Sequence, residues 1–135
     1  MHRHKSSYYY ISAAAAATGI AGILHFVLGV AAIGMAPIFG ILFFFLVAWI
    51  AQLFWVLPMI KRCGRIWYYI GIVGTVLLII LWAIVRIPDI ISGTGFPLSW
   101  EDISIIFLEI IYIGITVLII AKEKTVHASQ REELR

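Results

Sequence analysis

Long apolar runs separated by short charged segments dominate the chain. No Lys, Arg, Asp or Glu occurs from Ser6 to Ile60, and two further apolar runs precede the charged C-terminal segment. Apolar residues fill every side of a helix built from these runs, whereas a helix of a soluble protein keeps a polar face. Each run can supply the roughly 20 residues needed to cross about 30 Å of bilayer hydrocarbon. The pattern predicts a polytopic membrane protein.

The first apolar run is too long for one span. As a single helix it would reach about 80 Å at 1.5 Å per residue, more than twice the hydrocarbon thickness. Gly34 and Pro37 mark the expected turn, because glycine ends a helix easily and proline suits the first turn of the next. We therefore predict an all-α fold, a single transmembrane four-helix bundle with short cytoplasmic tails. Its helices are expected over about residues 8–33, 37–60, 66–87 and 100–121 of the 1–135 domain.

Two local signals refine the far end of the predicted bundle. Ser99 and Asp102 have capping-box spacing, with an Asp in place of the usual Glu or Gln, and this predicts the start of the fourth helix. Arg86 follows the third apolar run. We expect its long side chain to reach the outer interface or to pair with Asp89.

The distribution of basic residues predicts the orientation. Lys and Arg concentrate on the cytoplasmic side of multi-pass proteins. With four spans, Arg86 falls on one side of the membrane and the other basic residues on the opposite side: Arg3, Lys5, Lys61, Arg62, Arg65, Lys122, Lys124, Arg131 and Arg135. We therefore expect a protein of the cell (plasma) membrane with both termini in the cytoplasm.

Composition agrees with a lipid environment. Hydrophobic residues make up 63% of the chain and charged residues 13%, against about 25% charged in soluble domains. The net charge of +3 does not indicate nucleic acid as a partner, because the basic residues lie in short clusters beside apolar runs. Such clusters are typical of topology signals and of contacts with anionic lipids.

Small residues predict where the helices touch, because close packing rather than hydrophobicity drives association in lipid. The helix-packing candidates are Gly19, Gly22, Gly29, Gly71, Gly74 and Gly114. The alanine-rich first helix is the expected centre of the bundle. The second helix carries a broad aromatic flank that includes Phe43, Phe54 and Trp55 and faces either lipid or another protein.

Polar residues at membrane depth are the functional candidates, since ionisable groups there cost about 2.5 kcal/mol or more on insertion scales. His25 and Glu109 lie at similar predicted depths, so a direct hydrogen bond or ion pair between them is geometrically reasonable. Asp102, Glu109 and Thr116 are spaced by seven, Tyr112 lies one turn from Glu109, and Gln52 adds a deep amide. Together these side chains form a possible polar path into the bundle.

Three interpretations of the His25 and Glu109 pair remain open. The two residues can satisfy each other and fix the packing of two helices. They can form a proton- or cation-handling site, because a buried carboxylate beside an imidazole is a titratable unit. They can also belong to a metal or haem site, although one His and one Glu fall short of the usual three or four ligands unless a partner chain adds more. The identity of any metal is unknown, and no cofactor is predicted.

Catalytic motifs are absent from the sequence. It contains no nucleotide-binding loop, CxxC, HExxH or GxSxG motif, and no segment long enough for a soluble catalytic domain. The chain is therefore not expected to be an autonomous enzyme, although it can be a subunit of one.

Three stretches carry a likeness to a known group of proteins: Tyr8 to Leu28 (YYYISAAAAATGIAGILHFVL), Gly40 to Pro58 with its AQLFWVLP ending, and Gly64 to Pro88 with WYYIGIVGT. In these stretches the chain resembles small, uncharacterised four-span proteins of ammonia-oxidising archaea. The resemblance implies an archaeal plasma-membrane protein. It further implies an accessory subunit of a membrane complex such as the copper-dependent ammonia monooxygenase.

Two functions are consistent with these observations. The first is a non-catalytic accessory or structural subunit that packs against other integral membrane subunits. The second is a small oligomeric transporter or channel for protons, cations or a small amine that uses Glu109 and His25. Four spans are few for a substrate path, so self-association is expected in the second case.

Overall fold

The chain folds into four α-helices. The computed structural model describes residues 3–33, 39–92 and 98–133, and within them α1 covers Arg3–Ala32, α2 Phe39–Lys61, α3 Arg65–Ser92 and α4 Trp100–Glu133. Each helix contains a stretch that is long and apolar enough to cross a membrane. The predicted all-α four-helix fold is confirmed, and the four candidate spans indicate a multi-pass membrane protein. The predicted turn between Gly34 and Pro37 lies outside the described residues.

α1 begins at Arg3 rather than at residue 8, and two helices extend beyond their predicted C-terminal ends. α3 continues past position 88 to Ser92, where the sequence analysis ended it before Pro88. A proline lacks only its own N–H donor, and membrane helices tolerate it when neighbours compensate. α4 continues to Glu133 instead of ending near residue 121. Its last turns contain Lys, Glu, Ala, Gln and Arg, which all favour helix in water.

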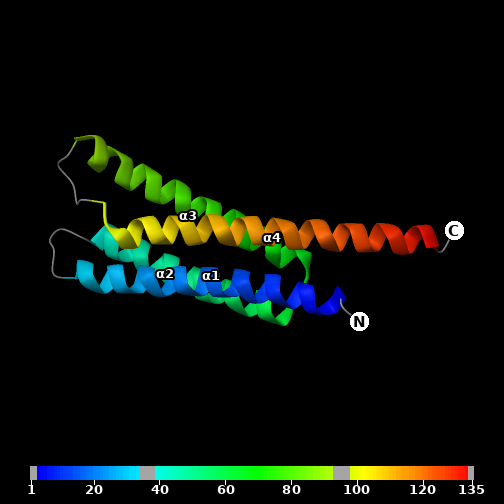
Figure 1. Ribbon diagram of the computed structural model, residues 1–135. Helices are drawn as coiled ribbons and strands as arrows, with labels where there is room; N and C mark the ends of the chain where they lie inside the picture. The colour runs from blue at the N-terminus through cyan, green and yellow to red at the C-terminus, as the bar shows by residue number, and fades with distance from the viewer. Residues whose placement is uncertain (1–2, 34–38, 93–97, 134–135) are drawn as a thin grey trace.

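The helices form a bundle with α1 packed between α2 and α4. α3 also contacts α2 and α4, but less extensively, and it leans away from the others toward its C-terminal end (Figure 1). Both ends of the chain lie at the same end of the bundle, here called the terminal end, which also holds the α2–α3 loop. The opposite, far end holds the start of α4 at Trp100. This arrangement has the even number of crossings that the basic residues predicted.

The α2–α3 loop is tight. The N–H of Cys63 donates to the Pro58 carbonyl (3.1 Å) and the N–H of Arg62 to the Met59 carbonyl (3.3 Å). This is the Schellman pattern that closes a helix C-terminus, with Arg62 at the position that glycine usually fills. Arg62 has a φ of 52°, and Gly64 follows with a φ of 110°. A left-handed conformation costs a non-glycine residue roughly 1–2 kcal/mol, so the contacts of the Arg62 side chain must help to hold it.

The interior has an apolar half and a polar half. At the terminal end a cluster of buried apolar side chains joins all four helices; it includes Ile11, Ala14, Met59, Tyr68 and Ile119. Toward the far end polar side chains are buried among apolar ones such as Leu78 and Ile105, and His25, Gln52, Glu109 and Asp102 are all less than 7% exposed. The apolar half supplies packing, whereas the polar half has to satisfy hydrogen bonds without water.

Three glycines of α1 lie against α2. A Cβ atom added at Gly22 would meet Gln52 Cβ at 3.3 Å, one at Gly29 would meet Phe45 Cβ at 3.2 Å, and one at Gly19 would meet Val56 at 3.6 Å. The partners move back along α2 as the glycines move forward along α1, as expected for antiparallel helices. The small residues therefore let the backbones of α1 and α2 approach, in agreement with their proposed packing role.

The glycines of α3 receive large side chains. The space that a Cβ atom would need at Gly71 is taken by the Tyr112 hydroxyl of α4, and at Gly74 by the Trp55 ring of α2. Gly114 differs, because it lies on the exposed side of α4 with nothing within 4 Å of an added Cβ. The expectation that Gly114 packs against another helix is therefore wrong within this chain.

This contrast gives a matched pair of variants. Gly74→Ala should destabilise the bundle by about 1–3 kcal/mol, because the new methyl group overlaps the Trp55 ring. Gly114→Ala should not destabilise the bundle and can stabilise it by up to about 1 kcal/mol, since its methyl group enters open space and alanine favours helix more than glycine. Unfolding in mild detergent, followed by circular dichroism, measures both. Equal losses would contradict the assignment of α3 to this contact.

Candidate functional site

Three side chains from three helices form a buried hydrogen-bonded chain. His25 of α1 contacts the Gln52 side-chain oxygen of α2 through Nδ1 (3.1 Å). The Gln52 amide nitrogen donates to Glu109 Oε1 of α4 (2.6 Å). His25 and Glu109 are each 2% exposed and Gln52 is fully buried. The polar half of the bundle is therefore organised around the His25–Gln52–Glu109 chain.

A backbone carbonyl fixes the direction of this chain. His25 Nδ1 also lies 3.0 Å from the carbonyl oxygen of Ala21, one turn earlier in α1. A carbonyl can only accept, so Nδ1 carries the hydrogen and donates to both Ala21 and Gln52. Gln52 must then present its oxygen to His25 and its amino group to Glu109. A reversed amide would set an N–H donor against Nδ1–H and an oxygen against the Glu109 carboxyl oxygen.

The deep His and Glu residues do not bond directly to each other. Gln52 lies between His25 and Glu109. Among the described residues, it is the side chain that joins each of them to another helix by a hydrogen bond. The sequence placed the two residues at a similar depth but left open whether they meet. A glutamine amide can donate and accept at once, which is why it can link an imidazole N–H to a carboxyl oxygen.

α3, which has no member in this hydrogen-bonded chain, contributes Thr75 at the same depth. Tyr112 of α4 lies against Gly71 of α3. One turn from this contact toward the far end, the antiparallel helices bring up Thr75 on α3 and Glu109 on α4. Thr75 is 1% exposed and its hydroxyl has no hydrogen-bond partner among the described residues. Thr75 was not among the predicted site residues, because a threonine in an apolar run gives no distinctive signal.

The polar residues of α4 lie on one face with a spacing of seven. Asp102, Glu109 and Thr116 are all buried, and Ile105 and Tyr112 fill the positions between them. This alternation of three and four is the pattern of a helix packed along a single seam. The seam was visible in the sequence through Thr116, and it continues one heptad farther than predicted.

That continuation is Glu123, which forms an ion pair with Arg65 of α3 (3.4 Å). Both side chains are more than one third exposed, so the pair contributes about 0–1 kcal/mol. Thr116 instead donates its hydroxyl to the Tyr112 carbonyl of its own helix (2.7 Å). Three of the four positions on the α4 seam thus contact a polar side chain of another helix.

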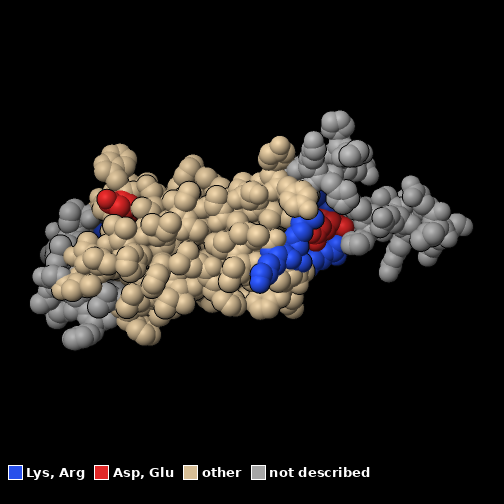
Figure 2. All heavy atoms as spheres, turned by 90° about the horizontal axis from the view of Figure 1, so that it is seen from below, with Lys and Arg blue, Asp and Glu red and all other residues tan. Residues whose placement is uncertain are grey.

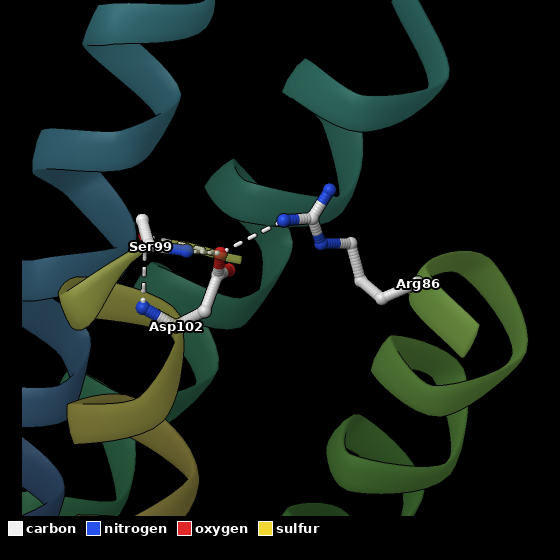
Figure 3. A network of polar contacts seen from close by, with 3 residues as sticks. All are labelled: Arg86, Ser99 and Asp102. Carbon is white, nitrogen blue, oxygen red and sulfur yellow. Dashed lines mark hydrogen bonds and ion pairs between the residues drawn. The ribbon is translucent and has the colours of Figure 1, made fainter. Parts of the chain in front are cut away.

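Arg86, Ser99 and Asp102 form a network of polar contacts at the far end (Figure 3). Arg86 of α3 donates to Asp102 Oδ2 of α4 (2.9 Å), and the two side chains are 14% and 7% exposed. Ser99 and Asp102 exchange hydrogen bonds: the Asp102 N–H donates to Ser99 Oγ (3.1 Å), and Ser99 N and Oγ donate to Asp102 Oδ2 (3.1 and 3.0 Å). The predicted capping box is confirmed. Asp102 as the partner of Arg86 was not anticipated.

Three buried hydroxyls in the bundle have no partner in the part of the chain that the structure describes. Thr18 Oγ1, Thr75 Oγ1 and Tyr112 OH have no hydrogen-bond partner among the described residues. Thr18 lies two turns from His25 on the buried side of α1, and Tyr112 lies one turn from Glu109. Unsatisfied buried hydroxyls are uncommon, and they are groups to which a water molecule or a ligand can bind.

The surroundings of His25 are aromatic rather than metal-binding. The Phe44 and Phe45 rings of α2 lie with their centroids 6.0 Å from the imidazole. Within the described residues, no group of three or more His, Cys, Asp or Glu side chains could hold a metal ion. A metal at His25 would need ligands beyond the described residues of this chain.

Comparisons of this chain with protein-family models, with curated proteins and with solved structures find no match.

The central role of Gln52 can be tested by a double-mutant cycle. Gln52→Leu should destabilise the bundle by about 1–3 kcal/mol, because it leaves the buried Glu109 carboxyl group without a donor. Combining it with Glu109→Leu should cost less than the sum of the single changes, since the double variant leaves no unpaired carboxyl group. Unfolding in mild detergent measures all three variants.

Ser104→Ala is the control for this cycle, because its hydroxyl is exposed and bonds to its own helix at Trp100. It should change the stability by less than about 0.5 kcal/mol. Additive effects of the Gln52 and Glu109 substitutions would contradict the energetic link between them.

Proposed function

We propose that this protein is a non-catalytic integral membrane subunit that packs through its helices against other membrane subunits. Its buried polar groups hold the bundle together, and its outer surface contacts the partner. The Gln52 amide at the centre of the His25–Gln52–Glu109 chain is the observation that carries the first statement. Ala21 fixes the orientation of His25, and the amide between His25 and Glu109 does not ionise near neutral pH, so it links the two groups by hydrogen bonds without serving as a proton carrier. Such a locked network suits a structural role.

The outer surface supports the second statement. The α2–α3 connection consists of residues 62–64, too few for a soluble functional unit. Only 22% of the candidate span is buried within the chain in α2 and in α3, against 44% in α1, and of these two helices α2 carries the aromatic flank. Phe43, Ile50 and Leu57 of α2 are each more than half exposed. This face is wide, apolar and aromatic, and it is the one that we assign to a partner rather than to lipid.

The identity of the complex is part of the proposal. The resemblance of the span sequences to small proteins of ammonia-oxidising archaea makes ammonia monooxygenase the first complex to test. The same proposal places the chain in the plasma membrane of an archaeon with both termini in the cytoplasm. The shared end of the two termini is compatible with this topology (Figure 1).

Native purification tests the subunit proposal. After gentle solubilisation, the chain should co-migrate at fixed stoichiometry with larger membrane proteins, as identified by mass spectrometry. Changing both Phe43 and Leu57 to Ala should weaken this association, because it removes exposed apolar area from α2. Phe107→Ala, at a position 62% exposed on α4, is the matched control and should not weaken it. A chain that runs only as a free monomer or homo-oligomer would contradict the proposal.

A second candidate function is transport of protons, cations or a small amine by an oligomer of this chain. The buried hydroxyls of Thr18, Thr75 and Tyr112 favour it, since they have no hydrogen-bond partner in the described structure and Tyr112 lies one turn from Glu109. Bound water or a hydrated ion would satisfy them. In this case the carboxyl group of Glu109 would receive the transported species, as intramembrane carboxyl groups of transporters do.

Flux into vesicles separates the two candidates. If the chain transports protons or cations, Glu109→Gln should abolish pH-dependent flux in proteoliposomes. The new amide can still accept the hydrogen bond from Gln52, so the bundle should remain folded. Glu101→Gln makes the same chemical change at an exposed position of α4 and should leave the flux unaltered. Flux that persists in Glu109→Gln would exclude this use of Glu109.

A further inference from the structure

Two buried hydroxyl groups lie close to each other where α3 packs against α4. The Tyr112 hydroxyl of α4 occupies the space that a Cβ atom would need at Gly71 of α3. Thr75 follows Gly71 by one helical turn, so their Cβ positions lie about 5–6 Å apart on the same side of α3. Tyr112 and Thr75 are each 1% exposed. The two hydroxyl groups are therefore neighbours in the interior of the bundle.

These two hydroxyl groups do not bond to each other. Neither Thr75 Oγ1 nor Tyr112 OH has a hydrogen-bond partner among the described residues. Because the Tyr112 oxygen takes the place of a Cβ atom at Gly71, we place the two hydroxyl oxygens roughly 4–6 Å apart. Two O–H···O hydrogen bonds in series, each about 2.8 Å long, bridge at most about 5.6 Å. The separation therefore suits one intervening water molecule.

Thr116 shows the usual alternative for a buried threonine in a helix. It is fully buried on α4, and its hydroxyl donates to the Tyr112 carbonyl, one turn earlier in the same helix (2.7 Å). The Thr75 hydroxyl makes no such bond to the Gly71 carbonyl. An unsatisfied polar group is costly in an apolar interior, and native structures usually provide it with a partner. For Thr75 and Tyr112 that partner is not a described side chain of this protein.

The two hydroxyl groups lie away from bulk water. Charged side chains gather near the two ends of the face shown in Figure 2, and the surface between them is uncharged. Thr75 and Tyr112 belong to the middle of the candidate spans Arg65–Ile84 and Trp100–Glu123. A water molecule bound to them is therefore sealed inside the bundle, as internal waters of proteins are.

We propose that one water molecule bridges Thr75 Oγ1 and Tyr112 OH and thereby joins α3 to α4 inside the bundle. Water and a hydroxyl group can each donate and accept, so both hydrogen bonds can form together. Globular proteins contain on the order of one such buried water per 27 residues. The bridge gives α3 a polar attachment in the interior that the His25–Gln52–Glu109 chain does not provide. This role is independent of the proposed partner subunits.

Proton-detected solid-state NMR of the whole protein in lipid bilayers tests the bridge. A through-space cross-peak should connect water protons with the side chains of both Thr75 and Tyr112. Thr75→Val should remove the cross-peak at Tyr112, and Tyr112→Phe should remove the one at Thr75, because a single water serves both hydroxyls. Thr116, whose hydroxyl bonds to its own helix, should show no such cross-peak. An unchanged Gln52–Glu109 contact shows that each variant is folded.

Two results of this experiment would overturn the proposal. One is the absence of a water cross-peak at Thr75 and Tyr112 in the native chain. The other is a cross-peak at Thr75 that persists in Tyr112→Phe, since the Thr75 hydroxyl would then contact water without the bridge.

The sign of a stability change provides a second test. If water bridges the two hydroxyls, Thr75→Val should lower the folded-to-unfolded ratio about tenfold, because the Tyr112 hydroxyl loses its partner. If the hydroxyls have no partner, the same change removes an unsatisfied group and should raise the ratio, and this result would overturn the proposal. Unfolding in mild detergent measures the ratio. Ser104→Ala, which removes an exposed hydroxyl of α4, is the control and should change the ratio by less than about twofold.

Discussion

A polar side chain inside a bilayer can find hydrogen-bond partners only within proteins or trapped water, and the His25–Gln52–Glu109 chain meets this constraint in the present bundle. Each hydrogen bond forms only when the two helices that it joins have one particular position along their axes relative to each other. Sliding α2 by a single turn would move Gln52 about 5 Å away from both partners. The three hydrogen-bonded side chains therefore select one register for α1, α2 and α4, whereas apolar packing alone would tolerate several. Buried polar groups often specify a structure in this way at some cost in stability.

The small residues of α1 make this network possible. Gly22 lies against Gln52 Cβ, so the α2 backbone comes close enough for its amide to reach past α1 toward Glu109. α3 is attached differently. Ion pairs with α4 join it near both ends, at Arg65 and Arg86, and the Trp55 and Tyr112 side chains fill its glycine positions. Its buried Thr75 hydroxyl has no hydrogen-bond partner among the described residues, so α3 stays outside the His25–Gln52–Glu109 chain.

Features that depend on neighbouring residues in the sequence could be predicted, whereas features that depend on contacts between helices could not. Charge-free runs and the Ser99–Asp102 spacing are local, so the four helices and the cap could be read from the sequence. The depth of His25 and Glu109 followed from counting along the spans. Their connection through Gln52 did not, because it depends on the rotation of α2 about its axis, and an apolar helix with uniformly hydrophobic sides does not reveal that rotation. The same uncertainty explains why the sequence did not show that Gly114 lies on the exposed side of α4. It also explains why Asp102 of the next helix was not predicted as a partner of Arg86.

The central claim is that Gln52 joins α1 to α4 in the folded protein. Solid-state NMR in lipid bilayers tests it directly, through the dipolar coupling between the Gln52 side-chain nitrogen and the Glu109 carboxyl carbon. The 2.6 Å hydrogen bond predicts a strong coupling that disappears in Gln52→Leu. Absence of this coupling in the folded native chain would contradict the account, because α2 and α4 would then not be held together through the interior of the bundle.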